Sequence, residues 1–184
     1  MADRTSGSHG TWARYEWRGP ARGWVKVSAA GVGSVFGSNG VVPASQRRQG
    51  TNTTPAGTFG LVYAFGVGNP GTRLPYRTVT SCSWWIGDPA QRDYNRWRQD
   101  CSALSKTDNE HLADHTSSLY RQAAVIDYNY YSPIHRGPGS GSGIFLHYAR
   151  SYTAGCVAIN SHSELTATLR WLDPAKHPRI VVKA

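Results

Sequence analysis

The residues best suited to chemistry in this chain are a cysteine and a histidine in its C-terminal third. Cys156 lies in the run 152–159, and His147 ends an apolar segment nine positions earlier. A cysteine attacks as the thiolate, so it needs an imidazole within reach to take its proton. Two further cysteines, Cys82 and Cys101, can pair with each other and leave Cys156 unpaired. This pattern makes Cys156 a candidate nucleophile and His147 its candidate base.

The neighbours of Cys156 allow this chemistry and also a purely structural thiol. Gly155 leaves room for a substrate backbone, and the main-chain N–H groups of 154–156 can form an oxyanion hole. We expect His147 to end one strand and Cys156 to begin the next, so that a tight connection brings the two strand ends side by side. The structural alternative is a buried thiol between Gly155 and Val157. Both interpretations remain open at this point.

Cys82 and Cys101 flank a polar, aromatic segment that is typical of an irregular excursion. A disulfide between them would close a loop of about 20 residues and contribute about 3 kcal/mol by the chain-entropy model. The excursion is then either a stapled binding flap or a structural staple alone. Disulfides also indicate an oxidising compartment, so we expect a secreted protein whose leader is absent from this chain.

The charge of the chain points to a polyanionic partner. Over 184 residues the formal net charge is +9, and the arginines are scattered in ones and twos instead of forming a basic arm. We therefore expect an anionic cell wall as partner and no nucleic acid. His111 and His115 are spaced for a metal on a helix, but no Glu follows His111, so we expect neither a metal nor a cofactor. No apolar run is long enough for a membrane span.

Short strands joined by tight turns dominate the pattern. Valines alternate with glycines between Trp24 and Val42, where β-branched residues favour strands and glycines favour turns. Further strands are expected at 59–65, 123–126, 144–147, 156–159 and 179–182. The stretch 108–122 is ambiguous between helix and loop, and the glycine-rich 137–143 is expected to be a flexible loop at the rim of a site.

One helix is expected near the C-terminus. Ser161 and Glu164 have capping-box spacing, leucines follow on one face, and Pro174 stops the helix. The whole pattern predicts a mainly β domain over 24–184. Residues 1–23 are polar and rich in glycine, and we expect them to form a loose segment that packs on the body.

Three motifs follow one another in a specific order. They are Thr-Pro-Ala-Gly-Thr-Phe at 54–59, Ile-Phe-Leu-His at 144–147 and Thr-Ala-Gly-Cys-Val at 153–157. Over about residues 24–184 the chain thereby resembles the YkuD-type L,D-transpeptidase catalytic domain, whose signature is a His followed by a Ser/Thr-x-Gly-Cys run. The first motif is moderately specific alone, and the three together are strongly specific.

The resemblance implies a β-sandwich-like domain with a few short helices and a cysteine acyltransferase acting on peptidoglycan stem peptides. Such enzymes attack the bond after the L-centre of diaminopimelate, release the following D-residue, and pass the acyl group from a thioester to an amine of a second stem. At matching positions, Cys156 is the nucleophile and His147 the base that becomes the acid. The N–H groups of Gly155 and Cys156 hold the oxyanion, and Thr153 orders the loop. Carbapenems are expected to acylate the same thiol.

The chain departs from the family pattern after the histidine. Tyr148 stands where a small residue is usual, and Thr153 follows His147 after six positions instead of about fifteen. The resemblance implies a catalytic triad of Cys156, His147 and a main-chain carbonyl near the histidine. The sequence does not assign the residue that supplies this carbonyl. The short connection predicts a cleft that is open on this side and closed by the 82–101 excursion or the 137–143 loop.

Several polar and aromatic residues are candidate substrate contacts. Trp84, Trp85 and Trp97 would pack on sugar rings or on one another, and Asn95 with Arg96 would hold stem-peptide carboxylates. The remaining candidates are Tyr148 beside the histidine and Asn129 after the strand 123–126.

Three functions remain in competition at this level. The first is transfer of the acyl group to an amine, and the second is hydrolysis by an L,D-carboxypeptidase or endopeptidase with the same Cys156 and His147. The third is a non-catalytic wall-binding module in which Cys156 is structural. Peptidases of the papain and NlpC types place the cysteine before the histidine, so the order here disfavours them.

Overall fold

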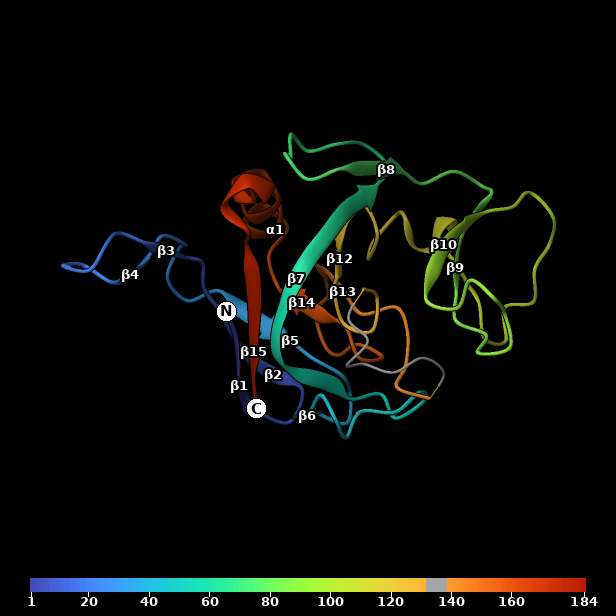
Figure 1. The fold of residues 1–184 in the computed structure, drawn as a ribbon, viewed down its shortest axis with the longest axis horizontal. Coiled ribbons are helices and arrows are strands. Elements are labelled where there is room, and N and C mark those ends of the chain that lie inside the picture. The colour runs from blue at the N-terminus through green and yellow to red at the C-terminus, as the bar shows by residue number, and fades with distance from the viewer. Residues whose placement is uncertain (132–138) are drawn as a thin grey trace.

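A computed structural model describes residues 1–131 and 139–184, and it is mainly β (Figure 1). Its ten-stranded sheet has the order β12-β13-β14-β5-β2-β1-β15-β7-β6, with β8 on β7. An additional pairing of β7 with β12 closes this sheet on itself, so β12 has a neighbour on both sides. The strands are β1 Ala2–Ser6, β2 His9–Trp12, β5 Gly33–Val35, β6 Val41–Pro43, β7 Thr54–Gly66, β8 Tyr76–Thr78, β12 Gln122–Ile126, β13 Phe145–Tyr148, β14 Val157–Ile159 and β15 Arg179–Lys183.

The long strand β7 makes the closure possible because it serves several neighbours in turn. It pairs with β6 at its start, with β15 through Gly57–Gly60, and with β12 through Leu61–Gly66. Gly57 has φ +151°, and a Cβ there would lie 2.8 Å from the Phe59 ring. A glycine is therefore required where the strand bends, and the curved path of β7 is visible in Figure 1.

The N-terminal residues belong to the main sheet, so the expectation of a loose segment over 1–23 is corrected for its first half. Strand β1 pairs with β15 and β2, and β2 pairs with β5. Ala2 and Trp12 are buried in the core, which explains why these polar strands are held in place. The following strands, β3 (Tyr15–Trp17) and β4 (Trp24–Lys26), form a hairpin that projects from the body in Figure 1.

The single α-helix of the described residues, α1 (His162–Trp171), begins as predicted. The Ser161 side chain accepts a hydrogen bond from the Glu164 N–H at 3.2 Å. The Glu164 carboxylate pairs with Arg14 Nε at 2.8 Å and therefore does not complete the capping box. The helix ends before Pro174, which starts the 3₁₀ helix η3 (Pro174–Lys176).

The strands predicted after residue 100 are confirmed within one or two residues, and the strand predicted at 59–65 lies inside the longer β7. The prediction at 59–65 falls in β7, and those at 123–126, 144–147, 156–159 and 179–182 correspond to β12, β13, β14 and β15. The ambiguous stretch 108–122 contains strand β11 (Glu110–His111) and the 3₁₀ helix η1 (Leu112–His115). The fold class is therefore as predicted, mainly β with few and short helices.

A separate three-stranded sheet carries the disulfide. It has the order β10-β9-β11, from β9 (Ser83–Ile86), β10 (Arg96–Gln99) and β11, and lies at one side of the main body (Figure 1). Cys82 and Cys101 are bonded to each other, as predicted, and Cys156 is free. We call residues 82–111 the stapled sheet.

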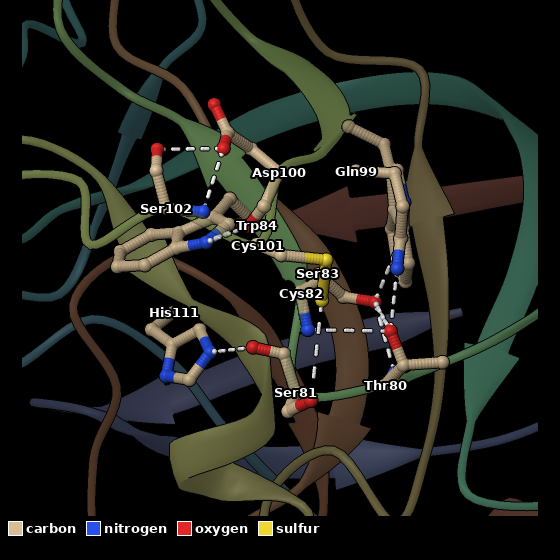
Figure 2. The surroundings of a disulfide bond; sticks show 11 residues. Thr80, Ser81, Cys82, Ser83, Trp84, Gln99, Asp100, Cys101, Ser102 and His111 are labelled. Atoms are coloured by element: carbon tan, nitrogen blue, oxygen red, sulfur yellow. Dashed lines mark hydrogen bonds between the residues drawn. A yellow bond between two sulfur atoms is a disulfide. The ribbon is translucent and has the colours of Figure 1, made fainter.

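The contacts around the disulfide fix β11 to β9. The Trp84 Nε1–H donates to Asp100 O at 3.0 Å, and the His111 Nε2 lies 2.7 Å from Ser81 O. The Trp84 and His111 rings are 4.4 Å apart at their centroids. Figure 2 shows these groups gathered around the bridge. The disulfide and the Trp84 ring therefore hold the strand that carries Glu110 and His111.

Replacing Trp84 by Ala should destabilise the protein by about 3 kcal/mol or more, because Trp84 is 3% exposed and its removal leaves a cavity. Urea unfolding measures the change. The matched control is Trp24→Ala, where the ring is 67% exposed and the expected loss is below about 1 kcal/mol. Equal losses in the two variants would contradict this role of Trp84.

Candidate active site

The pairing of β13 with β14 places Cys156 and His147 on one face of the sheet. The strands are parallel, with Leu146 opposite Val157 and His147 opposite Ala158. Side chains of facing residues point to the same side and alternate along each strand. Cys156 lies two positions before Ala158, the residue opposite His147, so the Cys156 and His147 side chains are on the same face of the sheet.

This register corrects the expectation that a tight connection sets the two strand ends side by side. The connection 149–156 crosses to a parallel strand and runs beside 36–38. The Thr153 N–H donates to Phe36 O at 2.9 Å, and the Ser38 N–H donates to Thr153 O at 3.0 Å. These bonds replace a hairpin turn as the element that positions Cys156.

Cys156 and His147 both line a cavity of about 280 Å³. Other residues of its wall include Trp85, Glu110, Leu119, Tyr120, Gly143 and Tyr152. The stapled sheet and residues 142–143 thus border the cavity, as expected from the short connection after His147. Residues 137 and 138 of the predicted 137–143 loop lie outside the described residues. The candidate nucleophile and the candidate base therefore line one enclosure.

The thiol of Cys156 is buried and protonated. Its Sγ donates to Gly143 O at 3.2 Å and accepts from the Phe145 N–H at 3.4 Å. Burial raises the pKa of Cys156 to about 12, and the nearby Glu110 charge also raises it. The Phe145 N–H and the Arg47 charge lower the pKa in part. The cysteine is therefore a neutral thiol at neutral pH.

His147 has one fixed tautomer. Its Nδ1 lies 2.8 Å from Tyr148 O, and a carbonyl oxygen only accepts, so Nδ1 carries the proton. The Nε2 atom is then unprotonated and available as a base. Burial lowers the pKa of His147 to about 4, against the effect of the Tyr148 carbonyl. The Tyr148 main-chain carbonyl is thus the hydrogen-bond partner of the histidine that the sequence did not assign.

Thr153 and Thr54 hold the loop that carries the thiol. The Thr153 hydroxyl donates to Cys156 O at 2.8 Å and accepts from the Gly155 N–H at 3.1 Å. The Thr54 hydroxyl donates to Cys156 O at 3.2 Å and accepts from the Gly37 N–H at 2.8 Å. The 54–59 motif therefore contacts the cysteine loop. The Gly155 N–H is engaged by Thr153, which differs from its expected contact with an oxyanion.

Arg47 is a charge beside this loop that the sequence did not single out. Its side chain is buried and donates to the carbonyls of Thr53 at 3.1 Å, Arg48 at 2.7 Å and Ser140 at 3.2 Å. A Cβ on Gly155, whose φ is +139°, would lie 2.9 Å from Arg47 Nη2. The Thr53 main-chain oxygen would be equally close, so the backbone requires glycine at 155, and the guanidinium places a positive charge near the sulfur.

Of the candidate substrate contacts only Trp85 is among the residues that line the cavity. Trp84, Asn95 and Asn129 are buried, and Trp97 packs on Phe65. Asn95 accepts from Trp85 Nε1–H and the Gly143 N–H and donates to Asn129 O, so it supports the cavity wall from behind. The Tyr148 ring stacks on His162, where both border another cavity of about 310 Å³. Arg96, the remaining candidate, donates to main-chain carbonyls.

Glu110 and Tyr120 are cavity residues that the sequence analysis missed. The Tyr120 hydroxyl donates to Glu110 Oε1 at 2.7 Å, and the Tyr120 ring meets the His147 ring edge-on with centroids 5.6 Å apart. Both lie in 108–122, where the periodicity was ambiguous and no motif marked them. Among the described residues, no group of three His, Cys, Asp or Glu side chains could hold a metal, and no helix is long and apolar enough to cross a membrane.

The protonation of His147 should make the protein less stable in acid. The pKa is about 4 in the folded chain and near 6.5 in the unfolded chain, so the unfolded chain binds an extra proton between these values. Protonation of His147 should therefore lower the free energy of unfolding by about 3 kcal/mol between about pH 7.5 and about pH 4. Urea unfolding of the wild type and of His147→Gln at both pH values measures it. The His147→Gln variant should lose about 3 kcal/mol less than the wild type on acidification. An identical loss in both proteins would contradict the lowered pKa of His147.

Comparison with known proteins agrees with this arrangement. The family model YkuD, described as the L,D-transpeptidase catalytic domain, matches residues 14–182. No curated protein and no solved structure matches the chain. Because the family match covers most of the sequence, the chain belongs to the YkuD family of L,D-transpeptidase catalytic domains.

Proposed function

We propose that the protein is a peptidoglycan L,D-transpeptidase that forms a thioester on Cys156 and passes it to an amine of a second stem. The observation that carries this proposal is the shared cavity of Cys156 and His147, with the His147 Nδ1 proton held by Tyr148 O at 2.8 Å. In a family of cysteine-dependent transpeptidases, this arrangement supplies a nucleophile and an oriented base.

The first half of the reaction forms the acyl-enzyme. His147 Nε2 takes the thiol proton as Cys156 Sγ attacks the stem carbonyl carbon and leaves its contact with Gly143 O. Because the pKa values of about 12 and about 4 disfavour a free ion pair, proton transfer accompanies the attack. The Cys156 N–H is the main-chain donor for the oxyanion, since the Gly155 N–H is bound to Thr153. His147 then protonates the leaving amine, and the thioester remains.

In the second half an acceptor amine attacks the thioester carbon. The C–N bond forms, the C–S bond breaks, and the sulfur regains a proton from His147, which has taken one from the attacking nitrogen. Water in place of the amine would give the hydrolytic reaction with the same residues. The disulfide and the net charge of +9 support action at an anionic wall outside the cell.

Mixing the protein with a tetrapeptide stem should give a covalent adduct on Cys156, detected by intact mass and peptide mapping. Cys156→Ala should give none and should keep its melting temperature within a few degrees. A dimeric product with a second stem indicates transfer, and release of the free acid indicates hydrolysis. A wild-type protein that forms no adduct with either the stem or a carbapenem would contradict the proposal.

Replacing His147 by Gln should slow adduct formation by about 100-fold or more, because general base catalysis contributes on this scale. Single-turnover mass spectrometry with the stem peptide gives the rate. The control is His162→Gln, which removes an imidazole that stacks on Tyr148 outside this cavity. Equal rates in wild type and His147→Gln would exclude His147 as the base.

A further inference from the structure

The cavity of Cys156 has an acidic wall in a basic protein. Glu110 and Asp108 are among its lining residues, and no Lys or Arg of the described chain lines it, although the net charge is +9. Opposite charges attract more strongly in an enclosed site than in open water. The cavity therefore favours a cationic group of a ligand.

Glu110 is the carboxylate held in a defined position. It lies on β11 opposite Trp85, which borders the same cavity. Its Oε1 accepts from the Tyr120 hydroxyl at 2.7 Å, and His115 Nε2 lies 3.6 Å from that oxygen. Within the described chain no hydrogen bond reaches Oε2, and 35% of the side-chain surface is exposed. One oxygen is thus fixed while the other is available to a ligand.

The stapled sheet fixes the strand beneath this carboxylate. The next residue, His111, stacks on Trp84 and contacts Ser81 O beside the Cys82–Cys101 bridge (Figure 2). The protein therefore orients Glu110 through both its main chain and its Tyr120 partner. A carboxylate held on two sides loses little freedom when it binds a ligand.

Glu110 does not assist the nucleophile. Its negative charge raises the pKa of Cys156, which opposes thiolate formation. Burial also raises the pKa of Glu110 itself, and a bound cation would favour its ionised form. A carboxylate that opposes the first half of the reaction needs a role in another step, and the transfer step requires an amine close to the same sulfur.

We infer that Glu110 binds the ammonium group of the acceptor, an inference that rests on the proposed transpeptidase function. The acceptor nitrogen must come within bonding distance of the acyl carbon on Cys156 Sγ, in the cavity that Glu110 borders. A charge-assisted hydrogen bond from the ammonium to Oε2 orients the nitrogen before it loses its proton. Glu110 is thus a specificity residue for aliphatic primary amines over water.

The test separates formation of the acyl-enzyme from its transfer. In Glu110→Gln, acylation by the tetrapeptide donor should be no slower than in wild type, and hydrolysis of the acyl-enzyme should be unchanged. The KM for the amine acceptor should rise by about 10-fold or more, as expected for loss of one charged hydrogen bond. The control Asp93→Asn removes a carboxylate of the stapled sheet that pairs with Arg98 outside the cavity lining and should leave the acceptor KM unchanged.

A second variant tests the same inference if Glu110→Gln disturbs the local structure. Tyr120→Phe retains the ring beside His147 but removes the donor to Glu110, and the acceptor KM should again rise, by a smaller factor. An unchanged acceptor KM in Glu110→Gln, slower donor acylation in that variant, or a wild-type acyl-enzyme that reacts with water alone would each overturn the inference. Absence of any acyl-enzyme in the wild type would instead overturn the proposed function.

Discussion

The parallel register between β13 and β14 is the constraint on which the site depends. It sets Cys156 and His147 on the same face and two positions apart along neighbouring strands. The register is held by the closed sheet, because β13 pairs with β12, β12 pairs with β7, and β14 pairs with β5. A shift of one residue would turn the thiol or the imidazole to the opposite face. The geometry of the pair is therefore a property of the whole sheet.

Burial of this pair explains its resting chemistry. Removing both groups from water favours their neutral forms, so the thiol is protonated and the imidazole is a weak base. The main-chain carbonyl of Tyr148 selects the tautomer that leaves Nε2 open, and the Thr153 hydroxyl fixes the loop carrying the thiol. The enclosed site thus holds Cys156 as a neutral thiol at neutral pH.

The stapled sheet supplies part of the wall of the same cavity. Trp85 and Glu110 line the cavity from β9 and β11. The Asn95 side chain ties this wall to Gly143, whose carbonyl accepts the Cys156 thiol hydrogen. The short connection after His147 leaves this side of the cavity without a flap of its own. Two regions of distant sequence therefore complete the enclosure, and the disulfide stabilises the one that carries the carboxylate.

The sequence by itself determined the local features of this protein. Alternation of valine with polar residues and glycine indicated the strands, Ser161 marked the start of the helix, and the cysteine count separated Cys82 and Cys101 from Cys156. Each of these signals depends on neighbours within a few positions. The motif order also indicated the family, because it records residue types at a fixed spacing.

Only the tertiary structure decided which residues meet. The polar strands 2–6 and 9–12 carry no strong strand signal and belong to the sheet because Ala2 and Trp12 are buried against distant residues. Trp84 and Asn95 look like surface contacts in the sequence, yet their polar groups find partners inside the fold and they become support for the cavity. Glu110, Tyr120 and Arg47 gain their positions near Cys156 through strand pairings and hydrogen bonds that span many residues. Burial and hydrogen bonding between distant segments are long-range properties, and spacing along the chain does not contain them.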